Sequence, residues 1–319
     1  MNPEGLKKRS EIIKRIRAFF DDRGYTEVHT PRLVGLPGQE PYLEPFWTEV
    51  VEQTGETHSA ALITSPEYAM KRLLAAGMDK IYDLGPCFRN NEPWDGTHDP
   101  EFLMLEWYRK DADLQSLMDE TEEMVRTVAI DRFIAPFRRL TVVDAWKEYA
   151  DIDLTALLND REAMAEVCRT NNQPVADDDT WDDLYNKIFL SQIEPQLGTE
   201  PTFLHRYPVS QAALAKRCED DPRFADRVEL YIGGLELANG FAELTDSDEQ
   251  RKRFEEEIAL RKSLGKNTWP VDEAFLETLP TIGKAAGIAF GVDRFVMLLT
   301  GSASMNDVIS VSARERFNR

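Results

Sequence analysis

Apolar side chains recur every three or four positions near the start of the chain, and this period predicts an amphipathic helix over residues 6–20. Gly24 follows at a position typical of a C-terminal helix cap. Residues 25–30 then alternate in the manner of a short strand, which Pro31 ends. The helical stripe that would face the core consists of Leu6, Ile12, Ile13, Ile16, Phe19 and Phe20.

A second helix is predicted to begin at the sequence Ser65-Pro66-Glu67. Ser65 can cap the helix, Pro66 suits its first position, and Glu67 lies in the first turn, where the helix dipole favours a negative charge. The apolar side of this helix would be formed by Met70, Leu73 and Leu74.

The later elements do not alternate as repeated β-α-β units, so a mixed or antiparallel sheet in an α+β fold is expected. They are strands over residues 81–90 and 102–109, a turn-rich polar loop between these strands, a helix over 112–130, an acidic and mostly helical insertion over about 150–200, strands over 202–207 and 227–243, a charged helix over 246–264 closed by Gly265, and a short strand over 287–290 that leads into a helix over 291–300 closed by Gly301.

The composition is that of a globular protein, with 42% hydrophobic and 30% charged residues among 319. No apolar run reaches the ~18 residues of a membrane span, and the charged N-terminus has no signal-peptide core, so we expect a cytoplasmic protein that does not enter a membrane. Three widely spaced cysteines fit a reducing compartment, and four histidines without ligand spacing predict no zinc site. These residues are Cys87, Cys168 and Cys218, and His29, His58, His98 and His205.

The formal net charge of −20 disfavours broad binding to nucleic acid, so tRNA is an unlikely partner on charge alone. The chain also lacks the Gly-x-Gly-x-x-Gly and Walker A motifs. A bound nucleotide would therefore be held by side chains.

The Gly233-Gly234 pair between two apolar runs predicts a hairpin with a two-residue turn. The turn would pair Ile232 with Leu235, Tyr231 with Glu236, and Leu230 with Leu237. Glu229 would then lie diagonally from Glu236, ~7–8 Å away by Cα. Two such carboxylates could share Mg²⁺ with nucleotide phosphates. They would be equally ordinary on an exposed outer face, and the hairpin geometry favours neither interpretation.

The strand over residues 102–109 places Phe102, Met104, Glu106 and Tyr108 on one face. An aromatic ring, a thioether, a carboxylate and a phenol together could bind an ammonium group on an apolar stem. The strand by itself is explained more simply as half exposed.

Two arginines lie where a phosphate could be bound. Arg89 ends a strand just before the polar loop, and Arg294 lies in the first turn of a helix, where the dipole also favours an anion. Taken singly, each arginine is explained more simply by a surface salt bridge.

Together these segments resemble the signature motifs of class II aminoacyl-tRNA synthetases, most closely the lysyl-tRNA synthetase group. Residues 19–31 resemble motif 1, the dimer element of the family, residues 87–108 resemble motif 2, and residues 287–294 resemble motif 3. Residues 236–246 resemble its lysine-site segment. The resemblance runs from about residue 6 to 312 and is weakest in the insertion. It implies the class II catalytic fold, an antiparallel sheet flanked by helices, and a homodimer formed through motif 1.

At the nucleotide, the resemblance implies that Arg89 holds the α-phosphate of ATP and the substrate carboxylate, while Arg294 binds the γ-phosphate. Phe102 would stack on adenine. Glu229 and Glu236 would bind Mg²⁺, which decides between the two interpretations of the hairpin. The further residues implied at ATP are Asn91, His98, Asp99, Leu237 and Gly291.

At the amino acid, the resemblance implies that Ser65 and Glu67 contact the amino end of the substrate. Tyr108 and Glu243 would bind its distal ammonium group. The supporting residues would be Glu106, Asn239 and Ala289, the last replacing a synthetase glycine.

Motif 1 begins so near residue 6 that no anticodon-binding domain precedes it, so residues 1–319 are expected to form a single catalytic domain. This organisation is similar to that of the elongation factor P–(R)-β-lysine ligases, which act on a protein lysine of elongation factor P. The loop of motif 2 is one residue longer than usual, so either Asn91 or Glu92 takes the place of the family's glutamate at ATP. A ligase acting on tRNA or a small amine, and a non-catalytic binding protein, are the alternatives.

Overall fold

The computed structural model describes residues 2–130, 132–197, 200–212 and 214–317. The chain divides into two compact units. The first unit comprises Met1–Ile134 and Glu243–Arg319, and the second comprises Ala135–Ala242. Among the described helices, none combines the length and the apolar character that a membrane crossing requires.

The first unit begins with helix α1 (Pro3–Asp21), which confirms the predicted amphipathic helix. Ile12, Ile16, Phe19 and Phe20 are its buried apolar side chains. The Phe20 ring stacks on Tyr82 with centroids 4.9 Å apart. Burying each phenylalanine contributes about 1.5–3 kcal/mol, so this stripe fixes the helix to the sheet.

The strand that follows α1 is shorter than predicted, because β1 covers Thr26–Glu27 alone. Gly24 has the left-handed φ of 72° that its capping position requires. Beyond β1, both the backbone N–H and the hydroxyl of Thr30 donate to the buried carboxylate of Asp83. The predicted strand thus ends early, and the side chain of Asp83 binds the residues before Pro31 through Thr30.

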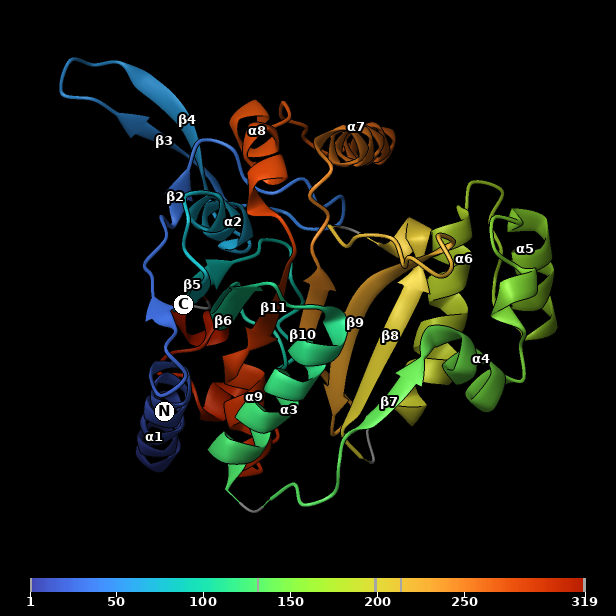
Figure 1. Cartoon of the computed structure of the whole chain (residues 1–319), viewed down its shortest axis with the longest axis horizontal. Helices are drawn as coiled ribbons and strands as arrows, with labels where there is room; N and C mark the ends of the chain where they lie inside the picture. Colours follow the sequence, from blue (N-terminus) through green and yellow to red (C-terminus); the bar gives the residue numbers. More distant parts are fainter. Residues whose placement is uncertain (1, 131, 198–199, 213, 318–319) are drawn as a thin grey trace. The chain divides into compact units, whose positions relative to one another are not determined.

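The main sheet of the first unit contains β1, β5 (Lys80–Phe88), β6 (Glu101–Lys110) and β11 (Ala285–Gly291) (Figure 1). β1 runs parallel to β5, whereas β5–β6 and β6–β11 are antiparallel pairs. The expected mixed sheet of an α+β fold is thus confirmed. Its register places Ala289 opposite Glu106 and Cys87 opposite Phe102.

Strand β6 is buried on both faces, which corrects the simpler interpretation of a half-exposed strand. On one face, Trp107 lies against Phe20 of α1 and donates to Glu120 of α3 (Leu114–Ala129). On the other face, Glu106 accepts a hydrogen bond from Ser65, directly before α2 (Glu67–Ala75). The exposure of the strand depends on helices from distant parts of the chain, which its own alternation does not reveal.

Helix α2 begins at Glu67, one residue later than predicted. The hydroxyl of Ser65 nevertheless accepts from the backbone N–H of Glu67 at 3.0 Å. Tyr68 of this helix stacks on Phe275 with ring centroids 4.1 Å apart. Phe275 belongs to α8 (Glu273–Ile282), a helix that the sequence analysis did not identify.

The other elements of the first unit include a small antiparallel sheet that the sequence analysis also missed. This sheet has the order β2-β4-β3, in which β3 and β4 form a hairpin. The charged helix and the helix after β11 were both predicted. The bounds are β2 (Leu33–Val34), β3 (Trp47–Val51), β4 (Thr57–Leu62), α7 (Ser247–Ser263), α9 (Val292–Thr300) and α10 (Ala313–Phe317).

The second unit contains four strands of the eight-stranded sheet and has an apolar core of its own. Its strands pair in the order β10-β9-β8-β7, with only the β7–β8 pair parallel. Trp146 and Tyr185 lie in its core, with ring centroids 4.9 Å apart. The mostly helical segment at 150–200 is present, although residues 198 and 199 lie outside the described residues. The bounds are β7 (Arg138–Thr141), α4 (Val142–Ala150), α5 (Arg161–Thr170), α6 (Trp181–Ile188), β8 (Thr202–Pro208), β9 (Phe224–Ile232) and β10 (Leu235–Ala242).

The predicted hairpin joins β9 to β10. Gly233 and Gly234 have φ angles of 65° and 76°, which suits a tight turn that other residues rarely adopt. The first two predicted pairs are confirmed, but the third is wrong. A register shift between Glu236 and Ala238 places Ala238, and not Leu237, opposite Leu230. An extra residue in one strand is a β-bulge, which sequence alternation does not mark.

Candidate active site

Three glutamates and one lysine form a buried cluster of charges in the first unit. Glu67 is 8% exposed, Glu106 1% and Glu243 4%, while Lys71 is fully buried. The Lys71 ammonium lies 2.6 Å from a carboxylate oxygen of Glu67 and 2.5 Å from one of Glu243. The cluster thus contains three acidic groups and a single balancing cation.

Local structure brings these groups together. Glu67 and Lys71 are one helical turn apart on α2, so their side chains share a face of the helix. Glu106 projects from the centre of β6. The position of Glu243 is fixed by its backbone N–H, which donates to the carbonyl of Ala285 at the start of β11.

Two hydroxyl groups orient the Glu106 carboxylate. Ser65 donates to one of its oxygens at 2.8 Å and Tyr108 donates to the other at 2.6 Å. Gly287 leaves the space that the Tyr108 ring occupies, because a Cβ at that position would lie 2.2 Å from the ring. The carboxylate predicted as a supporting residue is therefore held at both oxygens.

Burial dominates the electrostatics of the cluster. It raises the pKa of Glu106 above the ordinary range, and the nearby charge of Glu67 raises it further. Burial also raises the pKa of Glu243, although Lys71 opposes this shift. For Lys71, burial alone would lower the pKa, but Glu243 and Glu67 together raise it. The site favours additional positive charge, such as the ammonium groups of a ligand.

Arg89 and Phe102, the residues expected to bind phosphate and adenine, lie close together. Phe102 is on β6, the strand that also carries Glu106. The Arg89 guanidinium is 5.1 Å from the centroid of the Phe102 ring. Its buried Nε has no hydrogen-bond partner among the residues that the structure describes. Phe102 and Ala289 pack against the same small apolar group, which contains Met104. An arginine with an unused donor beside an aromatic face suits a phosphate with a stacked base.

Arg294 is in contact with the loop of motif 2. Its Nη2 lies 2.7 Å from His98 Nε2, and its Nε donates to the carbonyl of Thr97 at 3.2 Å. The opposite ring nitrogen of His98 lies 3.2 Å from the Asp95 carboxylate. The structure thus brings together two residues predicted at ATP, Arg294 and His98. Gly291, also predicted there, forms the N-cap of the same helix α9.

Two other predicted nucleotide residues have different surroundings. The buried carboxylate of Asp99 accepts from the backbone N–H of Ala313 at 2.8 Å and from Arg316 at 2.5 Å. These contacts bind the C-terminal helix α10. Asn91 is exposed in a left-handed conformation with φ 61°, whereas Glu92 is partly buried.

In the second unit, Glu229 is bound by three side chains. Tyr207 and Tyr231 donate to one oxygen at 2.5 and 2.6 Å, and Arg227 donates to the other at 2.5 Å. The hairpin register places Glu236 opposite Tyr231, as predicted, but the β-bulge between Glu236 and Ala238 brings Asn239 opposite Glu229 and so alters the expected diagonal relation. Carboxylates are the hard oxygen ligands that Mg²⁺ prefers, but both oxygens of Glu229 already accept hydrogen bonds, so an ion here would have to share or displace these contacts.

The remaining predicted residues of this hairpin lie on β10. Asn239 is opposite Glu229, and its buried Oδ1 has no hydrogen-bond partner within the described parts of the chain. Leu237 is buried at the β-bulge.

Sequence reasoning missed Lys71 and Arg227, the two basic residues that balance the predicted carboxylates. Each has a short-range signal that was available. Lys71 follows Glu67 by four residues on a helix, and Arg227 precedes Glu229 by two on a strand, so each pair shares a face.

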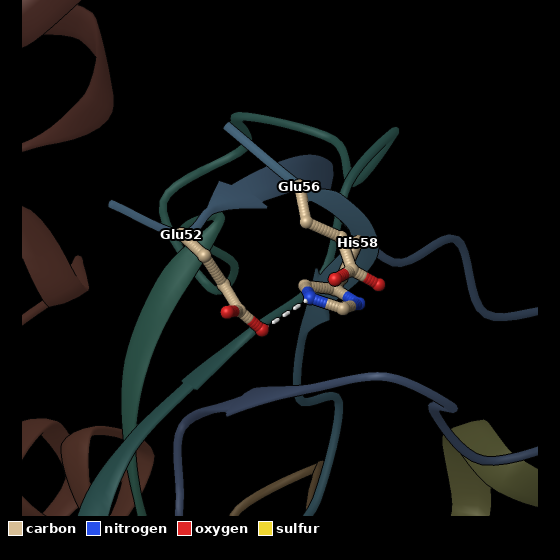
Figure 2. Close-up of side chains that lie close together, drawn as sticks. All are labelled: Glu52, Glu56 and His58. Atoms are coloured by element: carbon tan, nitrogen blue, oxygen red, sulfur yellow. Dashed lines mark hydrogen bonds and ion pairs between the residues drawn. The ribbon is translucent and has the colours of Figure 1, made fainter. Parts of the chain in front are cut away.

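A separate group of three side chains, Glu52, Glu56 and His58, lies at the tip of the β3–β4 hairpin (Figure 2). Their potential ligand atoms are within 4.8 Å of one another, and His58 contacts Glu52 at 2.8 Å. All three side chains are exposed, and exposed ion pairs of this kind form without a metal.

Comparison with known proteins places these observations in a family. The family "tRNA synthetases class II (D, K and N)" matches residues 2–313. The chain is 42% identical over 310 residues to the elongation factor P–(R)-β-lysine ligase of Proteus mirabilis, covering 96% of this chain and 94% of the relative. It is similar to the enzymes of the same name from Photorhabdus laumondii, 42% identical over 312 residues, and Yersinia enterocolitica, 41% identical over 310. Both alignments cover 96% of this chain and 94% of the relative.

Proposed function

Because this chain belongs to the class II tRNA synthetases of the D, K and N group, we propose that it is an ATP-dependent amino-acid ligase. Its substrate is (R)-β-lysine or lysine, which it activates as an acyl-adenylate. It then transfers the acyl group to a lysine side chain of elongation factor P. The names of its relatives support this acceptor and this substrate.

The observation that carries the proposal is the charge balance of the buried cluster. Glu67, Glu106 and Glu243 together exceed the single charge of Lys71 by two when all are ionised. Leaving carboxylates buried without cations is costly. A substrate with two ammonium groups, as β-lysine and lysine have, would bring positive charge to these carboxylates.

The first chemical step is attack by a carboxylate oxygen of the substrate on the α-phosphorus of ATP. The bond from this phosphorus to the oxygen bridging to the β-phosphate breaks, and pyrophosphate leaves. Arg89 would neutralise charge that develops on the α-phosphate, and Arg294 would bind the γ-phosphate. Such a displacement requires positioning and charge neutralisation more than a general base.

In the second step, the amine of the acceptor lysine attacks the acyl carbon. AMP leaves and the nitrogen loses a proton, which gives an amide. At the substrate, Ser65 and Glu67 would bind the amino end, and Tyr108 with Glu243 would bind the distal ammonium. The supporting contacts would come from Glu106, Asn239 and Ala289.

Glu229 and Glu236 would hold Mg²⁺, which neutralises phosphate charge when it is bound. The other proposed contacts of ATP are Phe102, His98, Asp99, Leu237, Gly291 and either Asn91 or Glu92. We also propose that the enzyme is a homodimer formed through residues 19–31, that residues 1–319 act as one catalytic domain, and that it works in the cytoplasm.

ATP–pyrophosphate exchange tests the proposal, with (R)-β-lysine and lysine compared side by side. Transfer of the labelled amino acid to elongation factor P is then compared with transfer to bulk tRNA. Exchange with label on the protein is the expected result. Exchange with label on tRNA alone would move the chain to the alternative tRNA ligase, which the longer loop of motif 2 leaves open. Absence of exchange with both amino acids would refute the proposal.

A further inference from the structure

A loop over residues 37–44 is fastened to the first unit by a buried arginine. Arg261 of α7 is fully buried and donates from Nη1 to the carbonyls of Glu40, Pro41 and Leu43 at 2.9–3.2 Å. Its Nη2 donates to the Glu44 carboxylate at 3.1 Å. Four contacts from one planar guanidinium group hold the loop around Glu40 in place.

Two further contacts hold the other end of the same loop. Trp269 donates from its indole nitrogen to the carbonyl of Pro37 at 3.1 Å. The Gln39 amide donates to the carbonyl of Pro270 at 3.0 Å. The path of the loop on both sides of Glu40 is therefore set by Arg261, Trp269 and Gln39, and the Glu40 side chain takes no part in these contacts.

The fixed backbone directs the Glu40 side chain into a pocket. Glu40 lines this pocket with Ser65 and Glu67, the residues assigned to the amino end of the substrate. Its Oε2 is buried and has no hydrogen-bond partner in the described ranges of the chain. Gly38 allows the approach, because a Cβ there would lie 2.4 Å from this oxygen.

The charges around Glu40 indicate which part of a ligand it faces. Burial and the charge of Glu67 raise the pKa of Glu40, while a hydrogen bond from its own backbone N–H and the charges of Arg89 and Arg261 oppose this shift. Glu40 therefore lies within electrostatic reach of both a carboxylate and an arginine of the predicted site. A second buried carboxylate beside Glu67 destabilises the ligand-free protein, and a cation between the two relieves the repulsion.

We propose that Glu40 is a specificity-determining residue of the amino-acid pocket, where it and Glu67 together bind the ammonium group nearest the substrate carboxylate. This inference rests on the proposed function. A purely structural role is a poor explanation, since Arg261 holds the loop through backbone carbonyls and Oε2 makes no hydrogen bond with the described residues. Two carboxylates at this point select for amino acids that carry an amine there.

The test compares Glu40→Gln with the wild type in ATP–pyrophosphate exchange. For (R)-β-lysine and lysine, kcat/KM should fall by about 10- to 100-fold, the usual effect of losing one charge-assisted contact. Inhibition by 6-aminohexanoate, which lacks the proximal amine but keeps the distal one, should change less than threefold. Glu49→Gln on the exposed strand β3 is the matched control, because it removes the same charge from the surface.

Thermal unfolding separates this role from a structural one. Glu40→Gln should be at least as stable as the wild type, since it removes repulsion from Glu67. Gly38→Ala should weaken use of both diamino acids in the same direction, because it displaces the carboxylate without removing its charge.

Unchanged exchange by Glu40→Gln, or an equal loss for 6-aminohexanoate, would overturn the inference. If the wild type failed to activate both diamino acids, the proposed function would fail first. Calorimetric titration of both proteins with lysine and (R)-β-lysine would then decide the inference separately. Equal affinities for the two proteins would refute it, and weaker binding by Glu40→Gln would support it.

Discussion

Replacing Lys71 by methionine removes the cation between Glu67 and Glu243 while keeping a long apolar stem in the buried site. The two ion pairs, at 2.6 and 2.5 Å, are lost together. Removing one partner of a buried pair costs about 3–5 kcal/mol, because the other charge stays buried. We therefore expect the free energy of unfolding to fall by about 4 kcal/mol at pH 8.

Lowering the pH should reduce this loss of stability, because Glu67 and Glu243, left without a cation, can each bind a proton. A proton taken up only in the folded variant contributes about 1.4 kcal/mol per pH unit. Lowering the pH by about two units should thus recover about 2–3 kcal/mol. Urea unfolding of the wild type and Lys71→Met at both pH values measures the difference directly.

The matched control is Lys252→Met on α7, where the lysine is 74% exposed and 3.7 Å from Glu256. Exposed pairs contribute about 0–1 kcal/mol, so this variant should unfold almost like the wild type at either pH. A loss from Lys71→Met no larger than that of the control, or a loss independent of pH, would refute the account of the buried cluster.

Three further predictions concern the same fold. The raised pKa of Glu106 means that ionisation of its carboxyl group opposes folding. The Tm of the ligand-free protein should therefore fall as the pH rises from about 4.3, the value in the unfolded chain, through the raised pKa of the folded protein. Glu106→Gln should make this fall in Tm smaller. Gly287→Ala should lower the free energy of unfolding by about 1–3 kcal/mol through its clash with the Tyr108 ring, whereas Gly35→Ala, with no atom within 4 Å of the added carbon, should not. Glu229→Gln should raise the Mg²⁺ concentration needed for half-maximal exchange by about tenfold, and an unchanged magnesium titration would contradict the proposed metal site.

The parts of the fold that sequence predicted are those with a local signal. The stripe of α1 has a clear helical period, and the Gly233-Gly234 turn has a strong steric requirement. The β3 strand was missed because all five of its residues are exposed, so no alternation marks it. The β-bulge at Leu237 was also invisible, since the sequence alternates as if the pairing were regular.

The candidate site shows the same limit more sharply. Lys71 was overlooked because lysine on an amphipathic helix is ordinarily solvated, and its burial depends on Glu243, 172 positions further along the chain. Asp99 lies within a recognisable motif, yet the C-terminal segment binds both of its oxygens. The tertiary structure decides which charged groups pair over long distances in the sequence, and the spacing of residues within a motif does not reveal these pairs.

The contacts of Arg261 have a consequence for how this pocket can change during evolution. The arginine recognises the carbonyls of the 37–44 loop, and every amino acid has a carbonyl. A mutation at position 40 therefore leaves the path of the loop intact while altering the chemistry that it presents. If Glu40 selects the substrate as proposed, a single substitution at this position would change selectivity while Arg261 keeps its contacts with the loop.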